Sequence, residues 1–239
     1  MSARRLEGRV CVVTGASSGI GRAVAGTLAE KGARVVGLAR RFDARAFLRL
    51  PEPGAIAPIR IDVTDAAGVE TCFAEIARLL GSNRGVDVLV NAAGSGHFAP
   101  LLSTEVDELR ALLEVHVVGS FLCSREALRI MAPQGRGHIV NIGSLAAVRT
   151  FAECAAYTAA KAGQLGLGRV LAEEARPAGV RVTTLIAGAV DTPIWDHRPG
   201  FDRSQMMRAE SIADVVVEVI DRPEIAVEEI LLTPPVGVL

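Results

Sequence analysis

"RVCVVTGASSGIG", residues 9–21, passes from an apolar run through a glycine-rich turn into the start of an amphipathic stretch. The run 9–15 is rich in β-branched residues that do not alternate with polar ones, which favours a strand buried on both faces. Apolar residues then recur at helical spacing over 19–32, a stretch closed by a glycine. A buried strand followed at once by a helix predicts the first unit of a parallel α/β sheet.

The same alternation continues along the 239-residue chain. Further strands are expected at 33–39, 58–63, 86–94, 137–144, 180–188 and 228–234. Further helices are expected in a short piece near 43–49 and at 67–80, 105–131 and 153–176. No linker-like tract precedes 187–205, so the sequence predicts one domain, 1–239, of the α/β class. Its fold is a doubly wound, seven-stranded parallel sheet with helices on both faces.

Composition and charge exclude several classes of function. The 26 basic and 27 acidic residues nearly cancel, so nothing favours binding to nucleic acid or to an anionic membrane. No apolar run reaches the roughly 18 residues of a membrane helix, and the N-terminal "MSARRLEGR" lacks the apolar region of a secretory signal. The cysteines are widely spaced without a CxxC motif, which argues against a disulfide framework and a metal site. We therefore expect a cytoplasmic protein.

The turn "TGASSGIG", 14–21, is the first candidate binding site. Gly15, Gly19 and Gly21 are spaced GxxxGxG, which differs from the GxGxxG dinucleotide fingerprint. The physical needs are similar: a tight turn, close approach of backbone to a pyrophosphate, and free N–H groups at a helix N-terminus. The pattern indicates a dinucleotide site, with an ordinary glycine-rich turn as the alternative.

The residues after the second expected strand bear on cofactor choice. An acidic residue there would bond a ribose 2′-hydroxyl, whereas an arginine accommodates a 2′-phosphate. This chain has Arg40 and Arg41 and no acidic residue at that place. The pair favours NADP(H) over NAD(H), although solvated surface arginines are the alternative.

The stretch "YTAAK", 157–161, holds the chain's single tyrosine and one of its two lysines. The spacing of four places Tyr157 and Lys161 on one helical face. An unperturbed phenol is a poor base at neutral pH, and a nearby ammonium lowers its pKa toward the working range. Ser144 ends an expected strand, where its hydroxyl would hold a substrate oxygen or only cap a turn. These residues indicate proton transfer to or from a hydroxyl.

Together these motifs resemble those of a classical short-chain dehydrogenase/reductase over essentially the full length of the chain. The matching segments are "TGASSGIG", "IDV" at 61–63, "NAAG" at 91–94, "AGAVDT" at 187–192 and the set Ser144, Tyr157 and Lys161. The resemblance implies a seven-stranded Rossmann sheet, a nicotinamide cofactor and usually a homotetramer, with a homodimer as the alternative.

The resemblance also implies roles for matching positions. Tyr157 would be the general acid in carbonyl reduction and the base in alcohol oxidation, and Ser144 would polarise the carbonyl. Lys161 would bond the nicotinamide ribose and lower the pKa of Tyr157. Asp62 and Val63 would contact adenine, Asn91 would shape the cofactor floor, and Val190 and Thr192 would bind the carboxamide. The other implied cofactor contacts are Ser17, Ser18, Ile20, Ala92, Gly94 and Gly188.

Two positions depart from the family pattern. Ala187 stands where the family has proline, which frees a backbone N–H and predicts a more mobile loop. His116, within "EVHVVGS", stands where the family has an asparagine that helps hold a water beside the catalytic lysine. Because imidazole titrates near neutrality, His116 is a candidate catalytic residue in a proton relay. The alternative is a buried histidine whose nitrogens have partners.

The substrate pocket is expected around Leu145, Cys154, Ile194 and Trp195, under a loop or lid at about 189–210. The apolar and aromatic residues of that loop favour a largely apolar substrate. No arginine for a substrate carboxylate or phosphate can be placed from the sequence. Small residues along 153–176 fit either helix-on-sheet packing or a subunit interface.

The combined pattern predicts an NADP(H)-dependent oxidoreductase that interconverts a ketone or aldehyde and an alcohol. A non-catalytic NADP(H) sensor on the same fold is the main alternative, but it would not need the proton-transfer pair. A lyase-type relative without the nicotinamide would lack the lysine and the glycine loop, and this chain has both.

Overall fold

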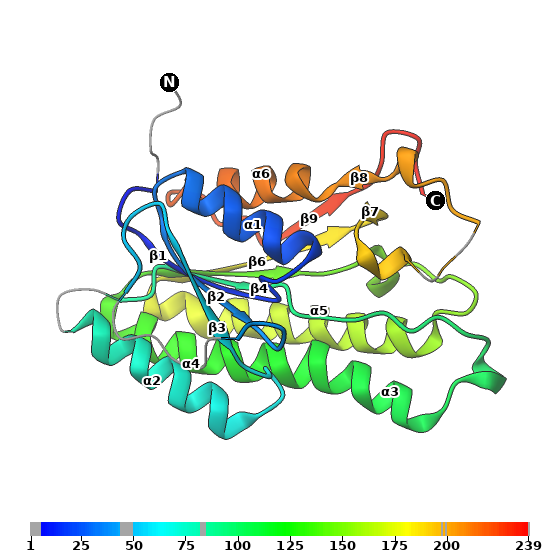
Figure 1. The fold of residues 1–239 in the computed structure, drawn as a ribbon, viewed down its shortest axis with the longest axis horizontal. Helices are drawn as coiled ribbons and strands as arrows, with labels where there is room; N and C mark the ends of the chain where they lie inside the picture. Colours follow the sequence, from blue (N-terminus) through cyan, green and yellow to red (C-terminus); the bar gives the residue numbers. More distant parts are fainter. Residues whose placement is uncertain (1–5, 44–49, 82–84, 197, 199, 239) are drawn as a thin grey trace.

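The computed structural model describes residues 6–43, 50–81, 85–196, 198 and 200–238. Within them a single parallel sheet of seven strands runs in the order β3-β2-β1-β4-β5-β6-β9 (Figure 1). The prediction of a seven-stranded, doubly wound parallel sheet is therefore confirmed. The short helical piece expected near 43–49 falls on 44–49, outside the described residues.

The strands and helices follow the alternation expected from the sequence. The strands of the main sheet are β1 (Val10–Thr14), β2 (Arg34–Ala39), β3 (Ile56–Arg60), β4 (Val88–Asn91), β5 (Gly137–Ile142), β6 (Val180–Ala187) and β9 (Glu229–Leu232). The α-helices are α1 (Gly19–Glu30), α2 (Ala66–Leu80), α3 (Val106–Leu113), α4 (Gly119–Gln134), α5 (Ala155–Ala175) and α6 (Ala209–Ile220). A small second sheet pairs β7 (Val190–Asp191) with β8 (Met207–Arg208).

Both faces of the sheet are covered, as the uninterrupted apolar strands require. On β1, Val10 and Val12 pack into the cluster that holds the buried faces of α2, α4 and part of α5. Cys11 and Val13 point the other way, into the cluster of α1 and α6. Figure 1 shows these two helical layers on opposite sides of the sheet. The alternation along one strand thus divides the core into two parts.

Three elements differ from the sequence expectation. Strand β3 covers Ile56–Arg60 instead of 58–63, and Pro58 is tolerated because β3 is the edge strand. Helix α6 was not among the expected elements, although its buried positions recur at helical spacing. The helix expected over 105–131 is divided into α3, a π-helical turn (Glu114–Val118) and α4.

The sheet topology fixes where a ligand can bind. The strand order reverses between β1, which continues to β2 and β3, and β4, which continues to β5 and β6. In open parallel sheets the loops at this switch point diverge and leave a crevice beyond the carboxyl ends of the strands. The glycine loop after β1 and the "NAAG" segment after β4 lie on either side of it.

Candidate active site

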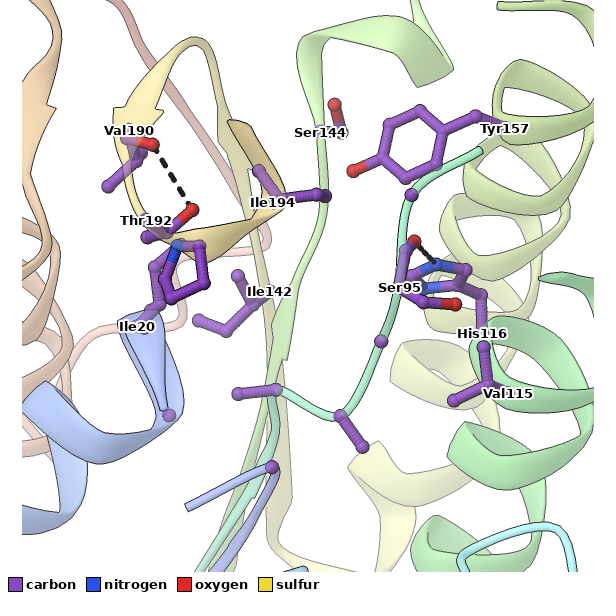
Figure 2. Close-up of a pocket in the computed structure, with 18 of the residues that line it drawn as sticks. Ile20, Ser95, Val115, His116, Ile142, Ser144, Tyr157, Val190, Thr192 and Ile194 are labelled. Carbon is purple, nitrogen blue, oxygen red and sulfur yellow. Dashed lines mark hydrogen bonds between the residues drawn. The ribbon is translucent and has the colours of Figure 1, made fainter. Parts of the chain in front are cut away.

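A cavity of about 700 Å³ opens beyond the carboxyl ends of the strands. All residues assigned to the site from the sequence line it except Asn91. Figure 2 shows Ser144 and Tyr157 facing the same part of the pocket, with Ile20, Val190 and Thr192 across from them. One cavity thus joins the glycine loop, the Tyr157–Lys161 helix and the segment after β6.

The glycine loop has no room for side chains where it meets the neighbouring loop. Gly15 has a φ of 68°, and a Cβ there would lie 2.6 Å from the carbonyl oxygen of Ala92. A Cβ on Gly21 would lie 2.5 Å from the carbonyl oxygen of Gly15. The loop is therefore a bare backbone cradle at the start of α1, as a pyrophosphate site requires. The cradle fits a dinucleotide.

Asn91 acts from beneath the cavity and not on its surface. Its side chain is buried, and Nδ2 donates to Ser124 Oγ and to Asn141 Oδ1, both at 2.9 Å. It ties β4 to β5 and α4, so it shapes the floor indirectly.

Arg40 and Arg41 differ in their contacts. Arg41 donates through Nε to Ser17 Oγ at 3.3 Å and also bonds the Ser18 hydroxyl, so its guanidinium lies over the glycine loop. The Arg40 side chain is 70% exposed and lies 4.0 Å from Asp62. Both line the cavity, but Arg41 is the one bound to the glycine loop.

Tyr157 lies partly buried between two rings. Its ring centre is 5.3 Å from that of Phe98 and 5.6 Å from that of His116. Burial raises the pKa of Tyr157 to about 12, and the neighbouring Ser144 hydroxyl opposes the rise. Ser144 Oγ accepts a hydrogen bond from the Ala146 N–H at 3.2 Å, so it also caps the short helix that follows β5. The two interpretations of Ser144 are compatible.

Lys161 is buried within hydrogen-bond reach of two acceptors. Nζ donates to the carbonyl oxygen of Ile142 and to Gln164 Oε1, both at 2.9 Å, and lies 5.9 Å from the Tyr157 ring centre. Burial lowers the pKa of Lys161 to about 7. Burial thus shifts the pKa values of Lys161 and Tyr157 in opposite directions, because desolvation disfavours the charged form of each group.

Gln164 was missed by the sequence reasoning. Its side chain is buried, accepts from Lys161 and donates through Nε2 to Ser120 Oγ at 3.0 Å. The available signal was its position three residues after Lys161, on the same helical face, within a run of small and apolar residues. The result is a buried chain of hydrogen bonds from Lys161 through α5 to α4.

His116 lies in the π-helical turn and is almost fully buried. Its Nε2 lies 2.8 Å from the carbonyl oxygen of Ser95, so Nε2 carries the proton, and Nδ1 has no partner among the described residues (Figure 2). Burial, together with the charge of Lys161, lowers the pKa of His116 to about 3. The expectation that it titrates near neutrality is therefore wrong, because the imidazole stays neutral.

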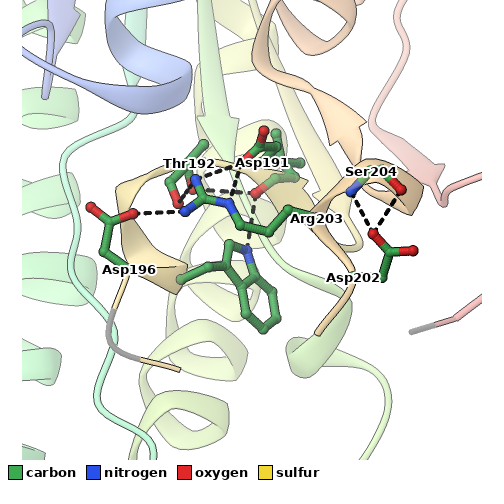
Figure 3. A network of polar contacts seen from close by, with 8 residues as sticks. Asp191, Thr192, Asp196, Asp202, Arg203 and Ser204 are labelled. Carbon is green, nitrogen blue, oxygen red and sulfur yellow. Dashed lines mark hydrogen bonds and ion pairs between the residues drawn. The ribbon is translucent and has the colours of Figure 1, made fainter. Parts of the chain in front are cut away.

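The described part of 189–210 is held by polar contacts, although the missing proline predicted a mobile loop. Ala187 continues β6 by pairing with Leu232 of β9, so the segment begins from a fixed strand. Arg203 donates to Asp191 at 2.6 Å and to Asp196 at 2.8 Å (Figure 3). Pairing of β7 with β8 joins both ends. Ile194 and Trp195 thereby line the cavity, together with Leu145 from the short helix after β5 and Cys154, the residue before α5.

Metal ligation and membrane insertion have no counterpart in the described structure. No group of three or more potential metal ligands occurs among the described residues. In that same portion of the chain, no helix is both long enough and apolar enough to cross a membrane.

Comparison with known proteins gives one consistent result. A model of the short chain dehydrogenase family matches residues 9–200. The chain is 39% identical to cis-4-hydroxycyclohexanecarboxylate dehydrogenase of Sinomonas cyclohexanicum, over 93% of this chain and 87% of that protein. It is 36% identical to D-threitol dehydrogenase of Mycolicibacterium smegmatis, over 82% and 77% respectively. An alcohol dehydrogenase of the archaeon Thermococcus sibiricus, solved with 5-hydroxy-NADP, superimposes with a TM-score of 0.82 at 26% identity, covering 96% of this chain and 97% of that one.

Proposed function

The chain belongs to the short-chain dehydrogenase family, an oxidoreductase family, and we propose that it is an NADP(H)-dependent enzyme interconverting a ketone or aldehyde with an alcohol. The observation that carries the proposal is the convergence of Ser144, Tyr157 and Lys161 on the cavity that the glycine loop also lines. A binding site and a proton-transfer site thereby share one pocket.

Cofactor binding and proton transfer share Tyr157 and Lys161, whereas the other contacts divide between the two tasks. When bound, the nicotinamide cofactor supplies hydride for reduction or accepts it in oxidation. The glycine loop, Asp62, Val63 and the Val190–Thr192 segment would hold it. Ser144 donates a hydrogen bond to the substrate oxygen, and Tyr157 transfers a proton to or from that oxygen. Burial raises the pKa of Tyr157, so the phenol is protonated at neutral pH and can donate its proton to a carbonyl oxygen.

The test is a titration of the protein with NADPH and NADH followed by a screen of carbonyl compounds for NADPH oxidation. Trp195 is the single tryptophan and lines the cavity, so its fluorescence reports binding. The screen includes neutral ketones, polyol-derived ketones and cyclohexanones, because the similar dehydrogenases are named for related alcohols. Binding of NADPH without turnover of any carbonyl or alcohol would favour the sensor instead.

Arg41→Ala is expected to raise the KM for NADPH by about 10- to 100-fold, which corresponds to losing one charge-assisted contact to a 2′-phosphate. The KM for NADH should stay within about twofold, because NADH lacks that phosphate. Arg40→Ala should have a smaller effect, since Arg40 is paired with Asp62 and Arg41 is the one that bonds the glycine loop. Initial rates with both cofactors measure this. Equal losses for NADPH and NADH, or tighter binding of NADH by the wild type, would contradict the preference.

His116→Leu is expected to lower kcat about tenfold with little change in thermal stability. We propose that the unpartnered Nδ1 of neutral His116 accepts a hydrogen bond from a water on the proton path to Lys161, a contact that leucine removes. His116→Asn is the matched polar variant and should retain more activity. Wild-type kinetics in the leucine variant would leave His116 as a buried structural residue.

We also propose that the protein is cytoplasmic and assembles as a homotetramer or homodimer through α4 and α5. Phe121 and Val170 are exposed on these helices, and a Cβ at Gly166 would meet open space. These positions face away from the sheet, so helix-on-sheet packing does not account for them. Light scattering of the purified protein measures the mass of the assembly.

A further inference from the structure

Arg198 places a guanidinium inside the substrate part of the cavity, among aromatic rings. Its Cζ lies 4.3 Å from the ring centre of Phe98, 5.0 Å from that of Phe201 and 5.7 Å from that of Trp195. Its side chain is only 20% exposed and lines the cavity. An arginine held against aromatic faces is fixed in position and partly desolvated, so its charge acts strongly on whatever binds beside it.

The guanidinium has unused hydrogen-bonding capacity. Within the part of the chain that the structure describes, its N–H groups make no side-chain hydrogen bond, and its ion pair is with Glu153 at 3.9 Å. The Glu153 side chain is 52% exposed, so water screens that pair and it is weak. Stacking occupies the faces of a guanidinium and leaves its edge, a planar fork of donors, available to a planar anion.

The position of Arg198 relative to Tyr157 indicates how far the substrate carbonyl would lie from the group that binds Arg198. The Phe98 ring neighbours both: its centre lies 5.3 Å from that of Tyr157 and 4.3 Å from Arg198 Cζ. Trp195 is stacked on Phe98 at 6.2 Å with an interplanar angle of 12°. A substrate whose carbonyl reaches Tyr157 would therefore lay an apolar segment along these rings before it reaches the guanidinium.

The number of negative charges on an anion that binds Arg198 depends on whether a second cation lies nearby. Arg40 and Arg41 lie at the glycine loop, and Lys161 bonds Ile142 and Gln164. His97, the other titratable group beside Phe98, is paired with Glu108 at 3.0 Å. One guanidinium without a second cation fits a single negative charge better than a phosphate.

We propose that Arg198 binds a substrate carboxylate, so that the substrate class is an oxo acid, or the corresponding hydroxy acid, with a short apolar spacer. The inference rests on the proposed carbonyl–alcohol activity and adds the chemical identity of the far end of the substrate. Bidentate bonding to the carboxylate replaces the long contact with Glu153.

The test compares 5-oxohexanoate with its methyl ester, in which esterification removes the negative charge and adds one methyl group, in the wild type, Arg198→Met and Arg198→Lys. The wild type should prefer the acid in kcat/KM by about 10- to 100-fold. Arg198→Met keeps the apolar stem and should lose this preference while kcat/KM for the ester stays within about threefold. Arg198→Lys should retain only part of the preference for the acid, since lysine keeps the charge but lacks the planar set of donors of the guanidinium. Arg149→Met, at an exposed arginine outside the cavity lining, should change neither.

Binding provides a readout independent of turnover. The acid should alter Trp195 fluorescence in the wild type and not in Arg198→Met, because the guanidinium lies against that indole. Equal use of acid and ester by the wild type, stronger preference for a phosphate-bearing ketone, or equal losses for both substrates in Arg198→Met would overturn the inference. In each of those outcomes neutral ketones are still reduced and the proposed function stands. Failure to reduce any carbonyl compound would remove the function itself.

Discussion

Tyr157→Phe is expected to lower kcat by about 10³-fold while binding of NADPH stays within about threefold, because phenylalanine keeps the ring and loses the transferable proton. The ring makes its contacts with Phe98 and His116 through carbon, so the packing around it should survive. Among the described residues of α5 that line the cavity, Tyr157 is the only one with a hydroxyl group. Steady-state turnover and Trp195 fluorescence measure the two quantities separately.

Thr158→Val is the matched control for that variant. Thr158 is the next residue of α5 and also carries a hydroxyl, but it does not line the cavity. Its removal should leave kcat within about twofold. Turnover that survived Tyr157→Phe would show that another group transfers the proton, and it would overturn the assignment of Tyr157.

Lys161→Met is expected to lower kcat by about 10²-fold and to change how the stability of the cofactor-free protein depends on pH. Burial lowers the Lys161 pKa from 10.5 to about 7, so between these values the unfolded chain binds a proton that the folded protein has released. The free energy of unfolding therefore gains a contribution that rises with pH over this window, by at most roughly 1.4 kcal/mol per pH unit. Below pH 7 both states hold the proton and the slope disappears.

Chemical denaturation at pH 7 and pH 9.5 measures this effect. The wild type should gain stability over this interval relative to Lys161→Met, in which the contribution of this lysine is absent. Lys31→Met is the control, since Lys31 is the chain's only other lysine and follows α1 away from the cavity lining. Identical pH dependence in the wild type and Lys161→Met would mean that Lys161 remains charged in the folded protein and that its burial is offset by its acceptors.

The fold was largely accessible from the sequence because its signals are local and repeated. The β1–turn–α1 unit combines an apolar strand with glycines that only a close backbone approach explains, and Gly15 and Gly21 meet that condition. Helix α6 was missed because a run such as Val215–Val217 favours a strand locally, whereas its buried face is decided by packing on α1. Tertiary contacts overrode local preference there.

The site was less accessible, because its electrostatics depend on burial and on contacts between distant segments. Spacing alone placed Tyr157 and Lys161 on one face, but it gave no measure of how far desolvation shifts their pKa values in opposite directions. The partner of Gln164 is Ser120 on another helix, and the rings around Arg198 come from two separate loops. No pattern along the chain encodes such pairings.

Because of the π-helical turn at Glu114–Val118, adding or removing a single residue there would change the geometry of the site. Successive α-helical residues are about 100° apart, so one extra residue in a turn rotates the helix before it by that angle relative to the helix after it. Deleting one residue here would let α3 and α4 merge into a continuous α-helix, rotate α3 relative to α4, and change how His116 faces Ser95 without substituting any residue. Such single-residue insertions and deletions would keep the segment helical. They offer evolution or a protein engineer a way to change the cavity lining at His116 in one step.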